Sequence, residues 1–124
     1  MSDRDCPPST TDRGRRGEEL AVEFLAREGY RIIERNFRVR GGEVDIIAYE
    51  GDVLCFVEVR SLASAEHGDP LETISPRKIA RVVHAARAYL AELPHPWPLM
   101  RFDAVGITGA GEPRIVLCRE AFEA

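Results

Sequence analysis

Two short runs of residues, Glu43 to Ala48 (EVDIIA) and Val53 to Val59 (VLCFVEV), constrain the fold of this chain more than any other feature. Both are dominated by β-branched and other apolar residues, which is typical of strands, and the Gly51-Asp52 step between them indicates a tight hairpin. If these two residues form the turn, residues whose numbers sum to 103 lie opposite one another. The chain is therefore expected to contain an antiparallel pair built from these runs.

Each of the two runs carries one acid within its apolar stretch. In the two-residue-turn register Asp45 faces Glu58, with Cβ atoms roughly 4.5 to 5.5 Å apart. A four-residue turn would pair Asp45 with Phe56 and leave Glu58 as a diagonal neighbour on the same face. Two close carboxylates in a buried segment are costly unless a cation compensates them. The alternative is a pair of strand-end acids, one bound to an arginine and the other to water.

A third acid precedes the hairpin on an expected helix from Gly17 to Arg27. The spacing of its apolar residues places Glu18 at the edge of the apolar face, so Glu18 can join Asp45 and Glu58. Three hard oxygen donors of this kind describe a Mg²⁺ or Mn²⁺ site, which in phosphate chemistry activates water and neutralises developing charge. Glu18 could equally cap the first turn of its own helix.

The remaining segments give an α/β chain of order α-β-β-β-α-β-β with a mixed sheet flanked by helices. Ser75-Pro76 indicates a helix start, and Gly29 indicates a helix end. At 124 residues the chain fits one domain, which we place at residues 14–124, after a disordered arm over residues 1–13. The expected elements besides the first helix and the hairpin are a strand at Tyr30 to Arg40, a polar loop at Ser61 to Ile74, a helix at Pro76 to Leu93, and strands at Arg101 to Ile107 and Pro113 to Arg119.

The charge is unevenly distributed along the chain. The net charge of −4 excludes a uniformly basic polyanion binder. However, residues 31–40 carry a net +3 and residues 77–87 a net +4, whereas residues 41–58 between them carry −5. This pattern suits an enzyme that grips a nucleic-acid backbone on both sides of a metal site, with Arg38, Arg40, Arg77 and Arg81 as the expected contacts. Alternatively, Lys78 and Arg81 belong only to a solvated helix face.

Composition also bears on location. The chain has no apolar run long enough to span a membrane, and its N-terminus lacks the pattern of a signal peptide, so we expect a cytoplasmic protein. The three cysteines show neither a disulfide framework nor zinc-ligand spacing.

Several short motifs together resemble a known family, the YraN-type uncharacterised bacterial proteins. These proteins look like members of the restriction-endonuclease-like superfamily and are similar in outline to archaeal Holliday junction resolvases. The resemblance covers about Gly14 to Asp103. It rests on Gly14-Arg15-Arg16-Gly17-Glu18, Gly29-Tyr30, Arg35-Asn36, Gly42-Glu43-Val44-Asp45, Phe56-Val57-Glu58-Val59, Lys78 and Arg101-Phe102-Asp103.

This resemblance implies a restriction-endonuclease-like fold and catalytic roles for Asp45, Glu58 and Glu18 in a metal-dependent deoxyribonuclease, with branched or damaged DNA as the substrate. The superfamily pattern is an acid on one strand, then acid-x-Lys on the next, and Arg60 stands at the lysine position. Arginine stays protonated and cannot act as a base, although it can hold a phosphate. Lys78 at the start of the second long helix could reach the site instead.

Three alternatives remain open from the sequence. The chain could be a catalytically inactive nucleic-acid-binding module or a protein-interaction domain, and Arg60 could simply form a cross-strand ion pair with Glu43. The resemblance also admits a homodimer, because the related resolvases work as dimers.

Overall fold

The computed structural model describes residues 10–62, 71, 74–109 and 111–123. Within them the elements follow the predicted order, α-β-β-β-α-β-β, so the α/β class is confirmed. The elements and their bounds are α1 (Thr10–Arg27), β1 (Tyr30–Val39), β2 (Gly42–Glu50), β3 (Val53–Leu62), α2 (Pro76–Ala91), β4 (Met100–Thr108) and β5 (Arg114–Phe122).

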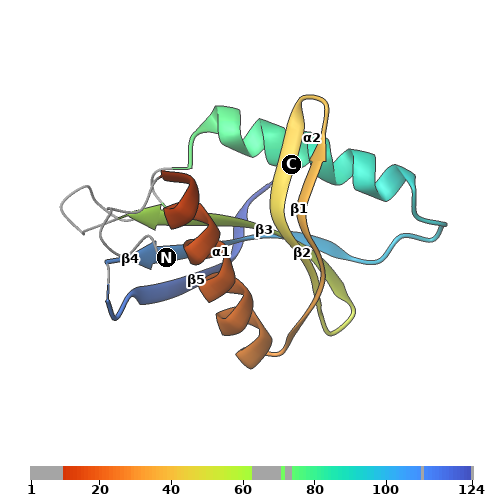
Figure 1. Cartoon of the computed structure of the whole chain (residues 1–124). Coiled ribbons are helices and arrows are strands. Elements are labelled where there is room, and N and C mark those ends of the chain that lie inside the picture. The colour runs from red at the N-terminus through yellow and green to blue at the C-terminus, as the bar shows by residue number, and fades with distance from the viewer. Residues whose placement is uncertain (1–9, 63–70, 72–73, 110, 124) are drawn as a thin grey trace, which may run out of the picture.

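The strands form one mixed sheet in the order β1-β2-β3-β4-β5 (Figure 1). Strands β3 and β4 are parallel, and every other neighbouring pair is antiparallel. A parallel pair needs a crossover connection, and α2 lies in the connection between β3 and β4. The mixed sheet predicted from the order of elements is thus confirmed.

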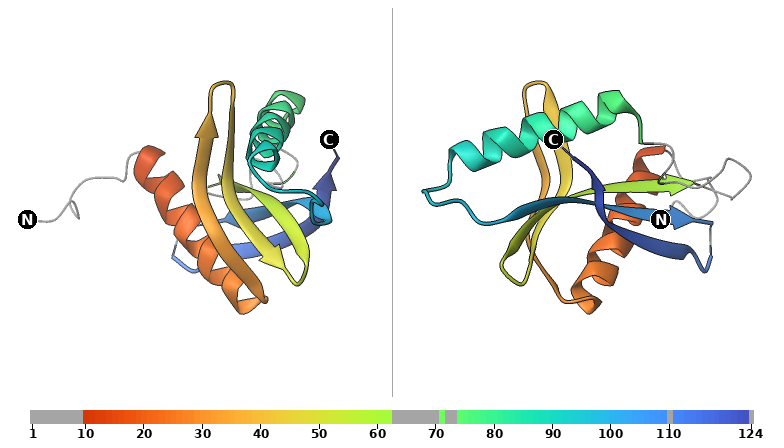
Figure 2. Two further views of the ribbon diagram at one scale, coloured as in Figure 1. Left: turned by 90° about the vertical axis from the view of Figure 1, so that its right-hand side faces the viewer. Right: turned by 180° about the vertical axis from the view of Figure 1, so that it is seen from behind.

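The two helices cover opposite faces of the sheet, which therefore forms the middle of three layers (Figure 2). On one face Ala21 and Leu25 of α1 pack in a buried cluster with Val57 of β3. On the other face Val82 of α2 packs in a second cluster with Phe56 of β3. Because side chains alternate along a strand, odd-numbered residues of β3 face α1 in this region and even-numbered ones face α2.

The β2–β3 hairpin has the register predicted from its two-residue turn. Glu50 pairs with Val53 and Ile46 with Val57, so partners sum to 103, and Gly51 has a φ of +59°. Glycine adopts such positive φ values without steric cost. Asp45 precedes Ile46 and Glu58 follows Val57, so both acids lie next to this pair, on the side away from the turn.

Helix α2 begins as its sequence predicts. The Ser75 side chain accepts a hydrogen bond from the backbone N–H of Lys78 at 3.1 Å, and Pro76 is the first helical residue. The helix ends at Ala91, two residues before the predicted end. The cap fixes where along the sheet the Lys78 side chain emerges.

Several predicted boundaries were wrong, and two of them fall in segments that were expected to lack regular structure. Helix α1 begins at Thr10, so residues 10–13, expected to be disordered, are helical, while residues 1–9 lie outside the described residues. Strand β3 continues to Leu62, into the predicted loop, because Leu62 pairs with Thr108 of β4. Most of the rest of that loop, residues 63–70 and 72–73, also lies outside the described part of the chain.

The helices in the described part of the chain are too short or too polar to cross a membrane. Cys55 and Cys118 are free thiols, whereas Cys6 is not among the described residues.

Candidate functional site

Glu58 is the most unusual side chain of the sheet. It lies on β3, two residues after Phe56, on the face that α2 covers, and its relative exposure is 1%. Neither of its carboxylate oxygens accepts a hydrogen bond from the described residues. Burial and the charge of Asp45 raise the pKa of Glu58 to about 8, although Lys78 partly opposes the shift. Near neutral pH Glu58 is therefore largely protonated, and Lys78 compensates its ionised form only in part.

Asp45 lies beside Glu58, as the register predicts. Its Oδ2 accepts a hydrogen bond from the backbone N–H of Val59 at 2.8 Å, which anchors the carboxylate next to Glu58. After burial, the charge of Asp45 is the second cause of the raised pKa of Glu58, so Asp45 disfavours the ionised form of Glu58. The structure thus brings together the two acids on which the sequence prediction depended.

Lys78 approaches the same pair from α2. Its Nζ lies 3.4 Å from Glu58 Oε2 and 3.5 Å from Glu43 Oε1. These distances are longer than the 2.7 to 2.9 Å, roughly, of well-formed charge-assisted hydrogen bonds. Lys78 does not occupy the lysine position of the acid-x-Lys pattern, which is held by Arg60. In the folded chain it nevertheless lies within ion-pair distance of Glu58, the acid of that pattern.

Glu18 does not join these acids, contrary to expectation. It is buried, but its Oε1 accepts hydrogen bonds from Arg35 Nε at 3.0 Å and from Asn36 Nδ2 at 2.8 Å, both on β1. The physical reason is the layering: α1 packs on the face of the sheet opposite to α2, and Glu58 points toward α2. Across the described residues, no three acidic, histidine or cysteine side chains form a group that could hold a metal ion.

The arginines expected to bind nucleic acid gather around Glu43 and α2. Arg38 of β1 and Arg81 of α2 both form ion pairs with Glu43, at 3.7 and 3.4 Å. The backbone carbonyl of Arg40 lies 3.0 Å from His84 Nε2 of α2. Arg77 is exposed in the first turn of α2, beside Lys78. Nucleic-acid contacts by these side chains remain a prediction.

The turn between β1 and β2 lies directly against α2. A Cβ added at Gly42 would lie 2.7 Å from the carbonyl oxygen of Arg81 and 2.8 Å from the backbone nitrogen of Ala85. Only glycine allows this approach of two backbones, and the approach places Arg38 and Glu43 beside Arg81.

Arg60 lies on β3 opposite Gly106 of β4. The ion pair expected between Arg60 and Glu43 stays a prediction. The ion pairs that the structure gives Glu43 are to Arg38, Lys78 and Arg81.

Comparison with known proteins identifies the family. The sequence model of the family described as "Uncharacterised protein family UPF0102" matches residues 17–107. The chain belongs to this family. It is 49% identical over 96 residues to a UPF0102 protein of Chlorobium phaeobacteroides (strain BS1), a match that covers 77% of this chain and 76% of that protein. It is 47% identical over 111 residues to a UPF0102 protein of Anaeromyxobacter dehalogenans (strain 2CP-C), covering 89% and 83% of the two chains. The YraN-type resemblance is thus confirmed.

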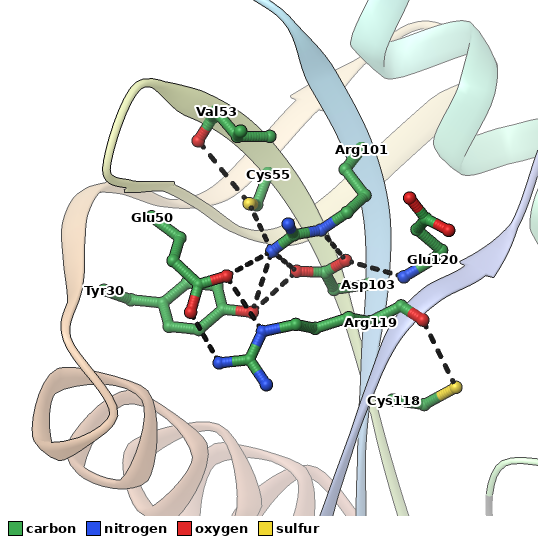
Figure 3. A network of polar contacts seen from close by, with 9 residues as sticks. All are labelled: Tyr30, Glu50, Val53, Cys55, Arg101, Asp103, Cys118, Arg119 and Glu120. Atoms are coloured by element: carbon green, nitrogen blue, oxygen red, sulfur yellow. Dashed lines mark hydrogen bonds and ion pairs between the residues drawn. The ribbon is translucent and has the colours of Figure 1, made fainter.

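Two of the family-like motifs, Gly29-Tyr30 and Arg101-Phe102-Asp103, meet in a polar network that the sequence did not predict (Figure 3). The fully buried Asp103 accepts hydrogen bonds from the Tyr30 hydroxyl at 2.7 Å, Arg101 Nε at 2.8 Å and the Glu120 backbone N–H at 3.0 Å. Burial and the hydrogen bond to Asp103 raise the pKa of Tyr30 above its usual value, so its hydroxyl remains a donor. The network connects β1, β4 and β5.

Glu50 extends this network to the end of the hairpin. Its carboxylate accepts hydrogen bonds from Arg101 at 2.6 Å and from both Arg119 Nε and Arg119 Nη2. The bonds from Arg119 outweigh the effect of burial and lower the pKa of Glu50 to about 2. Because its acids and cations are mutually satisfied, this cluster stabilises the packing of β5 against the hairpin.

Proposed function

We propose that the chain is a metal-dependent endonuclease that acts on DNA, and that branched or damaged DNA is its substrate. The observation that carries the proposal is Glu58: a buried carboxylate, without hydrogen-bond donors among the described residues, beside Asp45 and within ion-pair distance of Lys78. Folding such a group is costly unless a ligand compensates it. A site of this kind, bordered by basic side chains, fits phosphate chemistry.

Asp45 and Glu58 fit a Mg²⁺ or Mn²⁺ ion. Both ions prefer carboxylate oxygens with water completing the coordination shell, and both oxygens of Glu58 accept no hydrogen bond from the described residues. The cation would compensate the negative charges of Asp45 and of Glu58 in its ionised form. When bound, it would supply activation of a water molecule and neutralisation of charge on the phosphate. Glu18 is committed to β1 and is not proposed as a ligand.

Lys78 and Arg60 would supply positive charge rather than act as a base. The Lys78 ammonium lies within ion-pair distance of both Glu58 and Glu43. It can therefore stabilise negative charge that develops on a phosphate. Arg60 follows Glu58 by two residues on β3 and would do the same, as a permanent cation.

The nucleic acid would lie along the basic surface beside these acids. Helix α2 has the sequence PRKIARVVHAARAYLA, without an acidic residue, and the β1–β2 turn brings Arg38 and Arg40 next to it. Clustered arginine and lysine side chains bind the phosphate backbone without regard to sequence. In a bacterial cell this activity belongs to the cytoplasm, where the DNA lies, and a homodimer remains part of the proposal.

Cleavage of a panel of labelled linear, nicked and branched DNAs in Mg²⁺ or Mn²⁺ tests this function. We expect the wild type to cut at least one branched substrate, and Asp45→Asn to reduce cutting by at least about 100-fold through loss of metal affinity. Asp52→Asn, an identical change in the exposed hairpin turn, is the control and should keep full activity. Cleavage that survives unchanged in Asp45→Asn would rule out this site.

A noncatalytic nucleic-acid-binding module is the second candidate, because Arg60 stands where the superfamily pattern has lysine. This alternative predicts binding that weakens steeply with salt but no cleavage in either metal. Arg60→Lys separates the two candidates: if the substitution creates or raises cleavage, the site is a nuclease site that the arginine limits. If Arg60→Lys remains without activity on every substrate, the binding module is favoured.

A further inference from the structure

Glu43 collects three cations from two elements next to the candidate site. Its carboxylate lies 3.4 Å from Arg81 Nη2, 3.5 Å from Lys78 Nζ and 3.7 Å from Arg38 Nε. Arg38 comes from β1 and the other two from α2. We call these four residues the Glu43 cluster. Three cations around one carboxylate leave it with a net charge of +2.

The ion pairs of the Glu43 cluster are loose compared with others in the protein. Arg101 lies 2.6 Å from Glu50 and 2.8 Å from Asp103, distances typical of charge-assisted hydrogen bonds. The three cations of the Glu43 cluster are all 3.4 Å or more from their acid. Together they carry many more N–H donors than one carboxylate can accept. Donors that are close to an anion but poorly bonded to it remain available to a better acceptor.

The Glu43 cluster is also open to solvent. The Arg38 side chain is 71% exposed and that of Arg81 40% exposed, while Lys78 reaches inward to Glu58. A DNA phosphate is an anion with several acceptor oxygens, and arginine binds it in a two-pronged geometry. The Glu43 carboxylate therefore stands where such a phosphate would be held.

We propose that Arg38, Lys78 and Arg81 form a subsite for a DNA phosphate and that Glu43 occupies it in the free protein, so that binding must displace the Glu43 carboxylate. This inference rests on the proposed function. The Glu43 carboxylate competes with the phosphate, so it weakens the binding of DNA that contacts the protein only at this subsite. Substrates that also reach Arg77 or Arg40 gain enough contacts to displace it.

Besides the ion pairs of Glu43 with Lys78 and Arg81, the backbone at Gly42 packs directly against the backbone of Arg81 and Ala85. Removing the charge of Glu43 therefore leaves the docking of the turn in place, so Glu43→Gln is expected to fold. Its midpoint of thermal unfolding should stay within a few degrees of the wild-type value.

Binding of a fluorescent DNA duplex, measured by anisotropy in EDTA at several salt concentrations, tests the inference without catalysis. We expect Glu43→Gln to bind about tenfold more tightly than wild type at low salt and to show a steeper salt dependence, because more cations are free to pair with phosphates. Glu23→Gln makes the same change at an exposed position of α1 and should alter the affinity less than about twofold, through the net charge alone. The double variant Glu43→Gln/Arg81→Gln should lose the gain.

Each outcome has a distinct meaning. If wild type binds DNA and Glu43→Gln binds no better than Glu23→Gln, the competing role of Glu43 is wrong and the proposed function stands. If no variant binds DNA at low salt, the proposed function fails and this inference with it. If Glu43→Gln does not fold, Arg38→Gln and Arg81→Gln replace it. Each must then weaken binding more than Arg27→Gln, a control at the exposed end of α1, or the subsite is wrong.

Discussion

Replacing Glu58 by glutamine should stabilise the protein in a strongly pH-dependent way. The pKa of Glu58 is raised from an ordinary 4.5 to about 8, first by burial and then by the charge of Asp45. A carboxyl group whose pKa is higher in the folded state favours folding only while it is protonated. The folded state therefore loses stability as the pH rises from about 4.5 toward about 8. Glutamine has nearly the same shape and no charge, so it escapes this loss.

The size of the effect follows from the shift. Each unit of pKa difference corresponds to about 1.4 kcal/mol, so Glu58→Gln should gain less than about 1 kcal/mol near pH 5 and about 3 kcal/mol near pH 7. Above about pH 9 the gain should level off near 5 kcal/mol, an upper limit because local relaxation reduces the cost of a buried charge.

Urea unfolding in EDTA across this pH range measures the difference in the free energy of unfolding. Glu23→Gln, at an exposed position of α1, is the matched control and should follow the wild type. Added Mg²⁺ should stabilise the wild type above pH 7, roughly, but not Glu58→Gln, because a ligand that binds only the folded state shifts unfolding. Parallel pH profiles for wild type and Glu58→Gln would refute the reasoning.

Three further substitutions test other parts of the structure. Lys78→Met should raise the pKa of Glu58, because Lys78 lowers it, and carboxyl NMR titration measures this change. The same substitution should reduce DNA cleavage by at least about 100-fold in the DNA assay. An unchanged pKa of Glu58 would contradict the contact between the two side chains. Asp103→Asn should cost about 3 kcal/mol in urea unfolding, because it removes the charge from a buried, fully bonded carboxylate; a loss below about 1 kcal/mol would contradict the network. Gly42→Ala should destabilise by about 1 to 3 kcal/mol, because its Cβ would meet backbone atoms of α2, and an unchanged unfolding midpoint would show that the turn is not docked there.

The proximity of Asp45 and Glu58 could be predicted from the sequence because both residues lie in one hairpin with a short turn. The two-residue turn at Gly51-Asp52 sets the register of the hairpin, and Asp45 and Glu58 adjoin its last pair, Ile46 and Val57. The start of α2 was equally local, since Ser75 and Pro76 are neighbours of the helix that they begin. The predictions were right where the residues that determine a feature lie in one short segment of the chain.

The rest of the site depends on how remote segments pack. A helical projection places Glu18 on the buried side of α1, but it does not reveal that Arg35 and Asn36 of β1 lie beneath it. Likewise, Lys78 meets Glu58 only because α2 crosses the face of β3 toward which Glu58 points.

The same limit explains the features that the sequence did not reveal. Tyr30 and Asp103 are separated by 73 positions and meet only across the folded sheet. The Glu43 cluster depends on the approach of Gly42 to α2, which no local pattern encodes. Gly42 beside Gly41 is the one local sign of that approach, because a glycine without a turn function often marks close backbone contact.

Binding of Mn²⁺ measured by electron paramagnetic resonance tests the central claim most directly, because it needs neither DNA nor turnover. The wild type should bind one strongly held Mn²⁺ per chain. Asp45→Asn and Glu58→Gln should each weaken binding by at least about tenfold, while Asp52→Asn leaves it unchanged. A wild type that binds no Mn²⁺, or equal affinity in all four proteins, would contradict the claim that Asp45 and Glu58 share a divalent cation.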